Sequence, residues 1–312
     1  MTTAGAWHLD WNRDGLDWPN RGSSRFVQAA GVDWHIQIMG EGPVALLVHG
    51  TGASTHSWRD LAPILARQFT VIAPDLPGHG FSRVHDKSTL SLPGMSSALH
   101  GLLKALDVQP DVAIGHSAGV AILINMTLDR VIAPKSIVSL NGAIMPYYGT
   151  IGQMFAPLAK MLTTSSLVPR FLARRAEEQH VVNRLLKGTG SDLDRQGVEL
   201  YGRLARNPGH MAAALTMMAN WDLNTLLQRI PSLDVALTLI AGGDDQMINP
   251  QEAFQIKSMV RTAQVVYLRR LGHLAHEEQP GLIADQILTT ANQTGVLTSG
   301  DQADTKRKVA NR

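Results

Sequence analysis

The chain has 312 residues, of which 44% are hydrophobic and 17% charged, and its formal net charge is +2. These values are ordinary for a globular protein with a sizeable core, and so small a net charge argues against nucleic-acid binding. The absence of cysteine excludes disulfides, thiol catalysis and cysteine-ligated metal sites. No apolar run reaches the ~20 residues that span a bilayer, and the first residues lack the pattern of a secretion signal. We therefore expect a cytoplasmic protein without a transmembrane segment.

The N-terminal extension, residues 1–24, carries three of the six tryptophans, Trp7, Trp11 and Trp18. Their near-helical spacing fits an anchor for a membrane interface or a protein partner, or a segment folded back onto the domain. Acidic neighbours disfavour an anionic membrane, and we favour the fold-back. Residues 25–30 and 34–39 then predict a hairpin, after which strands and helices alternate from residue 44 to residue 140, as in an α/β fold.

This alternation stops after residue 144. Only helical stretches follow, at 155–162, 169–186 and 211–219, and we expect a helical cap over residues 145–220. The predicted core is therefore discontinuous, with parts at 25–144 and 221–298, and it ends with a helix at 281–292. Residues 299–312 are polar and predict a disordered tail.

The sequence Gly-His-Ser-Ala-Gly, at residues 115–119, lies where a short apolar strand turns into a predicted helix at 118–129. A glycine-flanked serine is often a simple tight turn. With a strand before it and a helix after it, however, the pattern is that of a nucleophile elbow, in which the glycines permit close strand–helix contact. Ser117 is the candidate nucleophile.

A serine nucleophile needs a base, an acid that orients the base, and donors for an oxyanion. His273 is the predicted base, in the sequence Leu-Gly-His after a predicted strand at 264–268. The acid is Asp245, in the turn after a predicted strand at 235–240; its neighbour Asp244 is the alternative. The glycine-rich loop after the strand at 44–48 predicts an oxyanion hole made by the backbone N–H groups of Thr51 and Ala118.

The other histidines have simpler interpretations. We expect His49 to orient the glycine-rich loop and His79 to form hydrogen bonds within a tight turn. His276 lies three residues after His273, a spacing that resembles a pair of metal ligands, but a third protein ligand is missing and no metal is expected. His116 faces either the core or the substrate pocket.

The substrate pocket is expected to include methionines of the cap, because methionine adapts to broad apolar ligands, although packing of the cap itself explains most of them. The candidate substrate-binding residues are His116, Met145, Tyr147, Met154 and Met217.

Together, the glycine-rich loop, the Asp-Leu-Pro-Gly-His-Gly turn at 75–80, the elbow, the Gly-Gly-Asp-Asp turn at 242–245 and the late Gly-His resemble the α/β-hydrolase superfamily over residues 25–296. This resemblance implies a mostly parallel, eight-stranded sheet flanked by helices, with the cap inserted before the strand that bears the acid. It also implies a serine hydrolase that needs no cofactor.

More narrowly, Asp-Trp-Pro-Asn-Arg at 17–21, Ser-Arg-Phe-Val at 24–27 and the runs at 49–61 and 75–81 resemble the BchO family. Its members are described as magnesium chelatase accessory proteins of bacteriochlorophyll biosynthesis in phototrophic bacteria, and so linked to photosynthesis. The resemblance implies a setting at the step where magnesium is inserted into protoporphyrin. The predicted triad and the methionine-rich cap favour an ester substrate that is large and apolar, or related to tetrapyrroles. The alternative is an accessory protein that binds a porphyrin or a magnesium chelatase subunit. No Gly-Lys-Ser/Thr loop for ATP is present, so the chain is not the chelatase motor.

Overall fold

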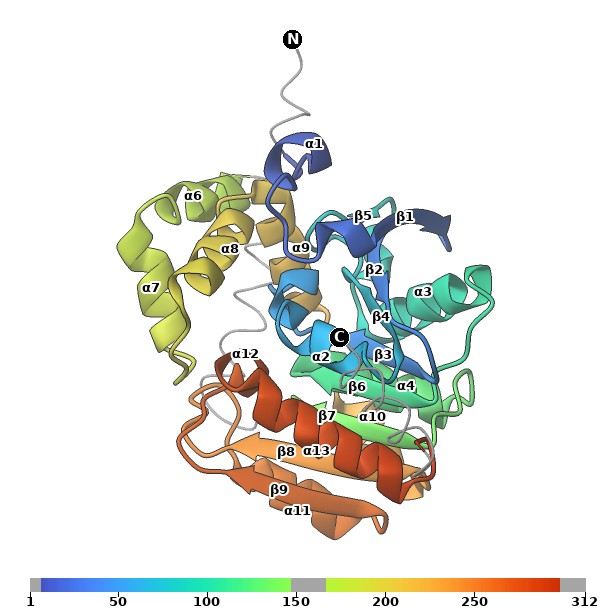
Figure 1. Ribbon diagram of the computed structural model, residues 1–312. Helices are drawn as coiled ribbons and strands as arrows, with labels where there is room; N and C mark the ends of the chain where they lie inside the picture. Colours follow the sequence, from blue (N-terminus) through green and yellow to red (C-terminus); the bar gives the residue numbers. More distant parts are fainter. Residues whose placement is uncertain (1–6, 147–166, 298–312) are drawn as a thin grey trace, which may run out of the picture.

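The computed structural model describes residues 7–146 and 167–297 (Figure 1). Its sheet runs in the order β1-β2-β4-β3-β6-β7-β8-β9, with β5 paired to β2. The pairings of β2 are antiparallel, whereas those from β4 through β3 to β9 are parallel. The strands are β1 (Ser24–Ala29), β2 (Val32–Met39), β3 (Val44–Val48), β4 (Thr70–Pro74), β5 (Arg83–Val84), β6 (Val112–His116), β7 (Ser136–Leu140), β8 (Ala236–Gly242) and β9 (Ala263–Leu268).

Helices cover both faces of this sheet, as the resemblance implies (Figure 1). Consecutive side chains of β3 point to opposite faces of the sheet, because Leu46 packs in one hydrophobic cluster and Leu47 in the other. The first cluster includes side chains of α3 (Leu92–Ala105), α4 (Ala118–Leu128), α10 (Asn224–Arg229) and α11 (Gln251–Met259). The second includes side chains of α2 (Leu61–Leu65), α12 (Ala275–Glu278) and α13 (Pro280–Gln293). Short 3₁₀ turns occur at η2 (Arg21–Ser23), η3 (Thr55–Trp58), η4 (Lys87–Thr89) and η5 (Ile230–Ser232).

Between β7 and α10, the described residues form four helices: α6 (Leu167–Arg175), α7 (Gln179–Lys187), α8 (Arg195–Ala205) and α9 (Pro208–Ala219). The sequence predicted one helical stretch over 169–186, whereas the structure has two helices, because Glu178 adopts an extended conformation at the start of α7. The expected strand number was also one short. β5 has only two residues, which is too few to produce an alternating pattern, and it adds a ninth strand to the sheet.

The N-terminal segment, residues 7–23, folds back onto the domain, as we favoured. Its short helix α1 (Trp11–Asp14) places Trp11 against Phe81, with 4.8 Å between ring centroids. Trp18 is only 2% exposed and donates a hydrogen bond to Thr55 Oγ1 at 3.1 Å. Trp18 also packs with Leu200 of α8, so this segment joins the core to the helices that follow β7.

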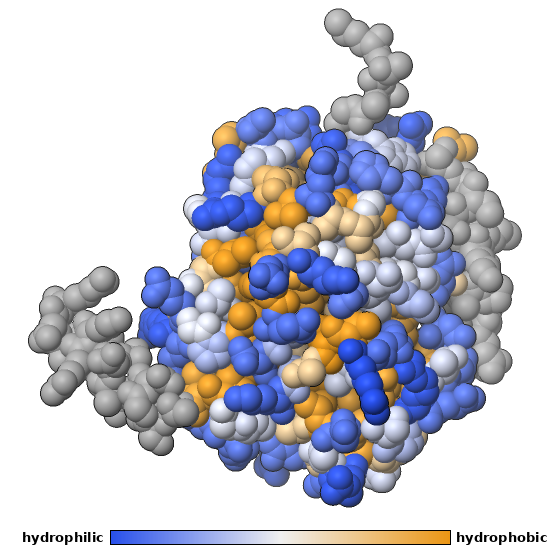
Figure 2. Space-filling model, turned by 90° about the vertical axis from the view of Figure 1, so that its right-hand side faces the viewer, coloured by the Kyte–Doolittle hydropathy of each residue, from blue (hydrophilic) through white to orange (hydrophobic). Residues whose placement is uncertain are grey.

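The surface view in Figure 2 shows apolar patches interrupted by hydrophilic side chains, so this face has no single continuous apolar surface. Within residues 7–146 and 167–297, no helix is long and apolar enough to cross a membrane.

Candidate active site

Ser117 occupies a strained turn between β6 and α4. Its backbone has φ 51° and ψ −120°, an unfavourable conformation for a residue with a side chain. The turn is fixed by hydrogen bonds from Ser117 N to Leu140 O at 3.0 Å and from Ala143 N to Ser117 O at 3.1 Å. The strain therefore falls on the serine itself, as expected for a nucleophile elbow.

The two glycines of the motif have a different role, which is to allow close packing. A Cβ at Gly115 would lie 2.7 Å from the backbone of Val120 in α4. A Cβ at Gly119 would overlap the carbonyl oxygen of Val48 at the end of β3. Both positions therefore exclude a side chain, and the elbow is held against β3 and its own helix.

His273 and Asp245 form a hydrogen-bonded pair, with 2.9 Å between His273 Nδ1 and Asp245 Oδ2. Asp245 follows β8, and His273 lies in the loop between β9 and α12. The neighbouring Asp244 is exposed and does not make this contact. Of the two aspartates that the sequence left open, the structure thus brings Asp245 to the histidine.

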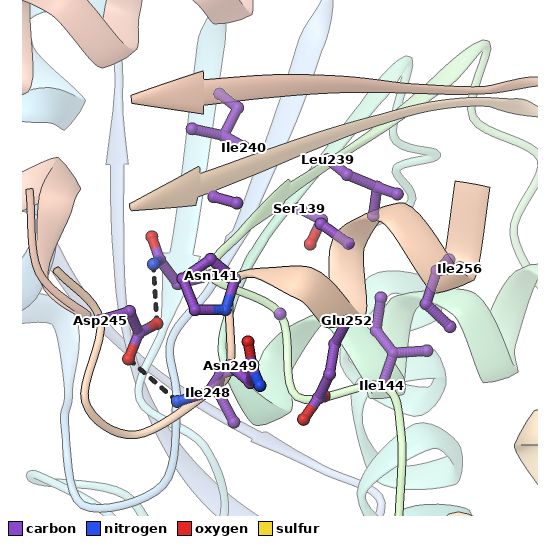
Figure 3. Close-up of a pocket in the computed structure, with 14 residues that line it drawn as sticks. Ser139, Asn141, Ile144, Leu239, Ile240, Asp245, Ile248, Asn249, Glu252 and Ile256 are labelled. Carbon is purple, nitrogen blue, oxygen red and sulfur yellow. Dashed lines mark hydrogen bonds between the residues drawn. The ribbon is translucent and has the colours of Figure 1, made fainter. Parts of the chain in front are cut away.

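Asp245 is held by three further donors, as Figure 3 shows in part. Its Oδ1 accepts from Met247 N at 2.7 Å and Ile248 N at 2.9 Å, while Oδ2 also accepts from Asn141 Nδ2 at 2.8 Å. Asn141 was not among the predicted residues. It lies just after β7, and its backbone has φ 48°, a conformation that asparagine tolerates. The only sign of it in the sequence was an asparagine at the end of a predicted strand.

The elbow and the His273 loop are adjacent. His116 Nε2 donates to the carbonyl oxygen of His273 at 3.0 Å, and the two rings have centroids 4.7 Å apart. Ser117 Oγ and His273 Nε2 have no hydrogen-bond partner within the described part of the chain. The structure thus does not form a hydrogen bond between these two atoms, and contacts of this kind often tighten only when a substrate is bound.

The glycine-rich loop after β3 lies against the elbow, since a Cβ at Gly50 would be 2.8 Å from Ser117 Cβ. The backbone N–H groups of Thr51 and Ala118 have no acceptor among the described residues. Thr51 directly follows Gly50 and Ala118 directly follows Ser117, so both N–H groups belong to the two segments that meet here, as an oxyanion hole would require.

His49 orients this loop, as predicted. Its Nε2 accepts from Leu76 N at 2.9 Å, so the ring proton is on Nδ1, which donates to Gly50 O at 2.8 Å. Burial lowers the pKa of His49 and so favours this neutral form. His79 is buried in its turn, with Nδ1 3.1 Å from Pro77 O.

The candidate substrate-binding residues have different positions. Met217 of α9 is fully buried, and its sulfur accepts from Thr51 Oγ1 at 3.5 Å, next to the proposed oxyanion loop. His116 is buried, and burial together with His276 and His273 lowers its pKa well below the usual value. Met145 packs half-buried against the core. Tyr147 and Met154 lie outside the described residues.

His276 is 2.8 Å from Ser57 Oγ through its Nε2 atom. Within residues 7–146 and 167–297, no group of three or more histidine, aspartate or glutamate side chains is arranged to hold a metal ion.

Comparisons with known proteins agree with this architecture. A model of the alpha/beta hydrolase family matches residues 45–286. The magnesium-chelatase 30 kDa subunit of Rhodobacter capsulatus is 36% identical over 280 residues, which cover 87% of this chain and 95% of that protein. Pyrrolizixenacetamide deacetylase of Xenorhabdus hominickii is 25% identical, over 78% of this chain and 88% of its own.

Among solved structures, a putative lipase from Acinetobacter baumannii superimposes with a TM-score of 0.74 at 22% identity, covering 91% of this chain and 94% of its own. This likeness concerns the fold. The family match and the similarity to the chelatase subunit span most of the sequence, and the chain belongs to the α/β-hydrolase family, with a relative in the magnesium-chelatase 30 kDa subunit.

Proposed function

We propose that the protein is a serine hydrolase that cleaves a carboxylic ester through an acyl-enzyme. The observation that carries this proposal is the strained Ser117 beside the loop that holds the His273–Asp245 pair. Strain of this kind persists where the surrounding structure enforces it, and it clusters at reactive sites. A serine that served only to make a turn would need no such histidine–carboxylate pair nearby.

In the proposed reaction, Ser117 Oγ attacks the ester carbonyl carbon while its proton passes to His273 Nε2. The N–H groups of Thr51 and Ala118 bind the oxyanion, and Asp245 holds the ring with the proton on Nδ1. His273 then returns the proton to the departing alkoxide. Water attacks the acyl-enzyme with His273 as base, releasing the acid and restoring Ser117.

Serine as the elbow residue distinguishes this chemistry from that of enzymes whose elbow aspartate forms an alkyl-enzyme. A serine nucleophile supports acyl transfer. Support for an ester with an apolar acyl or alcohol group comes from Met217, whose fully buried side chain borders the oxyanion loop. Support for a tetrapyrrole-related ester comes from the relative described as a magnesium-chelatase subunit.

The first test is a reaction of the purified protein with a fluorophosphonate, measured by intact mass. We expect one covalent adduct on the wild type and none on Ser117→Ala. Ester hydrolysis by the variant should fall by roughly 10⁴-fold or more, since removing the nucleophile leaves only binding and oxyanion stabilisation. A Ser117→Ala protein that retained esterase activity would refute the mechanism.

The second candidate function is a non-catalytic accessory protein that binds a porphyrin or a magnesium chelatase subunit. The similarity to the chelatase subunit, over 95% of that relative, favours it. Complementation of a strain that lacks the gene separates the two functions. If Ser117→Ala restores pigment synthesis as well as the wild type does, binding is the biological role; if it fails while remaining folded, catalysis is.

A further inference from the structure

The loop between α7 and α8, residues 189–194 (hereafter the cap loop), contacts both loops that carry the proposed base and acid. We propose that the cap loop is a positioning element that fixes His273 and Asp245 relative to each other. This inference rests on the proposed function of that pair. It assigns a role in catalysis to a segment that touches neither the nucleophile nor the oxyanion hole.

A single carbonyl oxygen bridges the two catalytic loops. Thr189 O accepts from His273 N at 3.1 Å and from Gln246 N at 3.3 Å. The first donor is the proposed base itself, and the second is the residue after the proposed acid. Ser191 adds a third contact, because its Oγ accepts from Leu274 N at 2.8 Å. Each loop therefore satisfies a backbone N–H group with an atom of the cap loop.

Packing at this junction leaves no room for a side chain. Gly190 has φ +79°, and a Cβ there would overlap the carbonyl oxygen of Asp244. A Cβ at Gly272, next to His273, would overlap the backbone of Gly190. The three loops thus meet backbone to backbone, so a displacement of one is transmitted to the others.

The cap loop is itself anchored. Asp194 caps α8 by accepting from Gly197 N at 2.7 Å, and the same oxygen pairs with Arg59 Nη2 at 2.6 Å. Farther along α8, Tyr201 donates to Glu277 Oε1 at 2.7 Å, within the short helix that follows His273. These bonds hold α8 against the core on the side of the base. A movement of α8 would therefore also disturb the base and the acid.

The test compares two substitutions that add the same methyl group. Gly190→Ala forces a Cβ against the Asp244 carbonyl, whereas Gly188→Ala, just before the cap loop, has a negative φ and no atom nearer than 3.2 Å. We expect Gly190→Ala to lower kcat about 10- to 100-fold with little change in KM, because a shift near 1 Å at a catalytic group has effects of this size. Gly188→Ala should stay within about two-fold of the wild type.

Ser191→Ala provides a milder second variant, should Gly190→Ala fail to fold. It removes only the hydrogen bond to Leu274 N, and we expect a several-fold fall in kcat. A kcat unchanged in both variants would overturn the positioning role.

A readout that does not require turnover separates this proposal from the proposed function. The His273 Nδ1 proton, hydrogen-bonded to Asp245, should give a low-field NMR resonance that is absent in Asp245→Asn. We expect this resonance to shift or broaden in Gly190→Ala and Ser191→Ala but not in Gly188→Ala. If it moves while the wild type hydrolyses no ester, positioning stands and the hydrolase proposal fails. If it stays unchanged in both variants, positioning fails.

Discussion

At the scale of single residues, the orientation of Asp245 decides whether the proposed triad can work. The carboxylate accepts four hydrogen bonds, two on each oxygen, and so has little freedom to rotate away from His273. Asn141 shares Oδ2 with the histidine. Its left-handed backbone, at the end of the strand next to β8, aims the amide at that oxygen.

Replacing Asp245 by asparagine tests this arrangement. The amide would present N–H groups where His273 Nδ1 and Asn141 Nδ2 need an acceptor, and the imidazole would lose its correct tautomer. We expect kcat for an activated ester to fall about 10⁴-fold in Asp245→Asn, with the fold intact by circular dichroism.

Asp244→Asn is the matched control, because Asp244 is exposed and does not contact the histidine. Its kcat should remain within about two-fold of the wild type, as for most surface substitutions. Equal losses in the two variants would show that the acid is misassigned.

At the scale of elements, the N-terminal segment contributes to stability although it lies outside the sheet. Trp18 is buried among Phe81, Leu200 and Leu204, and its indole N–H reaches Thr55. Arg203 of α8 adds contacts to Asp17 at 2.6 Å and to Asp14 O at 2.7 Å, on the same side. The segment thus fastens α8 to the core from the end opposite the cap loop.

Truncation of this tryptophan should have a large effect. We expect Trp18→Ala to lower the free energy of unfolding by about 3–5 kcal/mol, from lost burial and the cavity left behind. Leu16→Ala, at a side chain that is 67% exposed, should change it by less than about 0.5 kcal/mol. Urea unfolding of both variants measures the difference, and similar small changes in the two would mean that the segment is not bound to the domain in solution.

Local patterns in the sequence account for the elements that could be predicted. The strand, turn and helix around Ser117 follow one another directly, and β3 has a continuous apolar run, so each is visible in a short window. The two-residue β5 has no such window. The contacts of Asn141 and Thr189 depend on strand order and on how the helices after β7 dock, which a local pattern does not contain. The sequence therefore predicted the residues that stand in recognisable motifs, such as Ser117. It did not predict residues such as Asn141 and Thr189, which hold the motif residues in place.

At the scale of the whole molecule, an unusual share of the histidines is buried. Eight of the twelve are buried, and burial is the largest cause that lowers the pKa of six of these eight. These six are His49, His56, His79, His116, His210 and His276. The pKa of His210 falls to about 4 and that of His276 to about 3, so the folded protein keeps these rings neutral at a pH where free histidine is charged.

Two glutamates change the proton balance in the opposite direction, because their pKa values are raised. Burial, with the charge of Asp245 as a second cause, raises the pKa of Glu252 to about 7. Burial also raises the pKa of Glu277 to about 7, with Asp60 adding to the rise and Arg59, Ser57 and Tyr201 acting against it. Between pH 4.5 and 7 these carboxyls hold protons that the unfolded chain has released, so their contribution to stability grows as the pH falls.

The histidines outnumber the glutamates, and stability should therefore fall in mild acid. Histidine has a pKa of 6.5 in the unfolded chain, so below this pH the unfolded chain binds protons that the six buried rings of the folded protein do not bind. The free energy of unfolding therefore decreases as the pH falls from 6.5 toward 4. The free energy of unfolding is therefore expected to have a positive slope with pH between pH 5 and pH 7.

Urea unfolding at pH 7, 6 and 5 measures this slope. His276→Gln should reduce it by about one proton, whereas His85→Gln, which removes a side chain that is 64% exposed, should leave it unchanged. A free energy of unfolding that stays constant from pH 7 to pH 5 would contradict the burial of these rings. If the free energy of unfolding of the wild type falls with pH, and falls less steeply only in His276→Gln, the loss of stability in acid is caused by the buried histidines. His276 is one of these, with its Nε2 atom 2.8 Å from Ser57 Oγ.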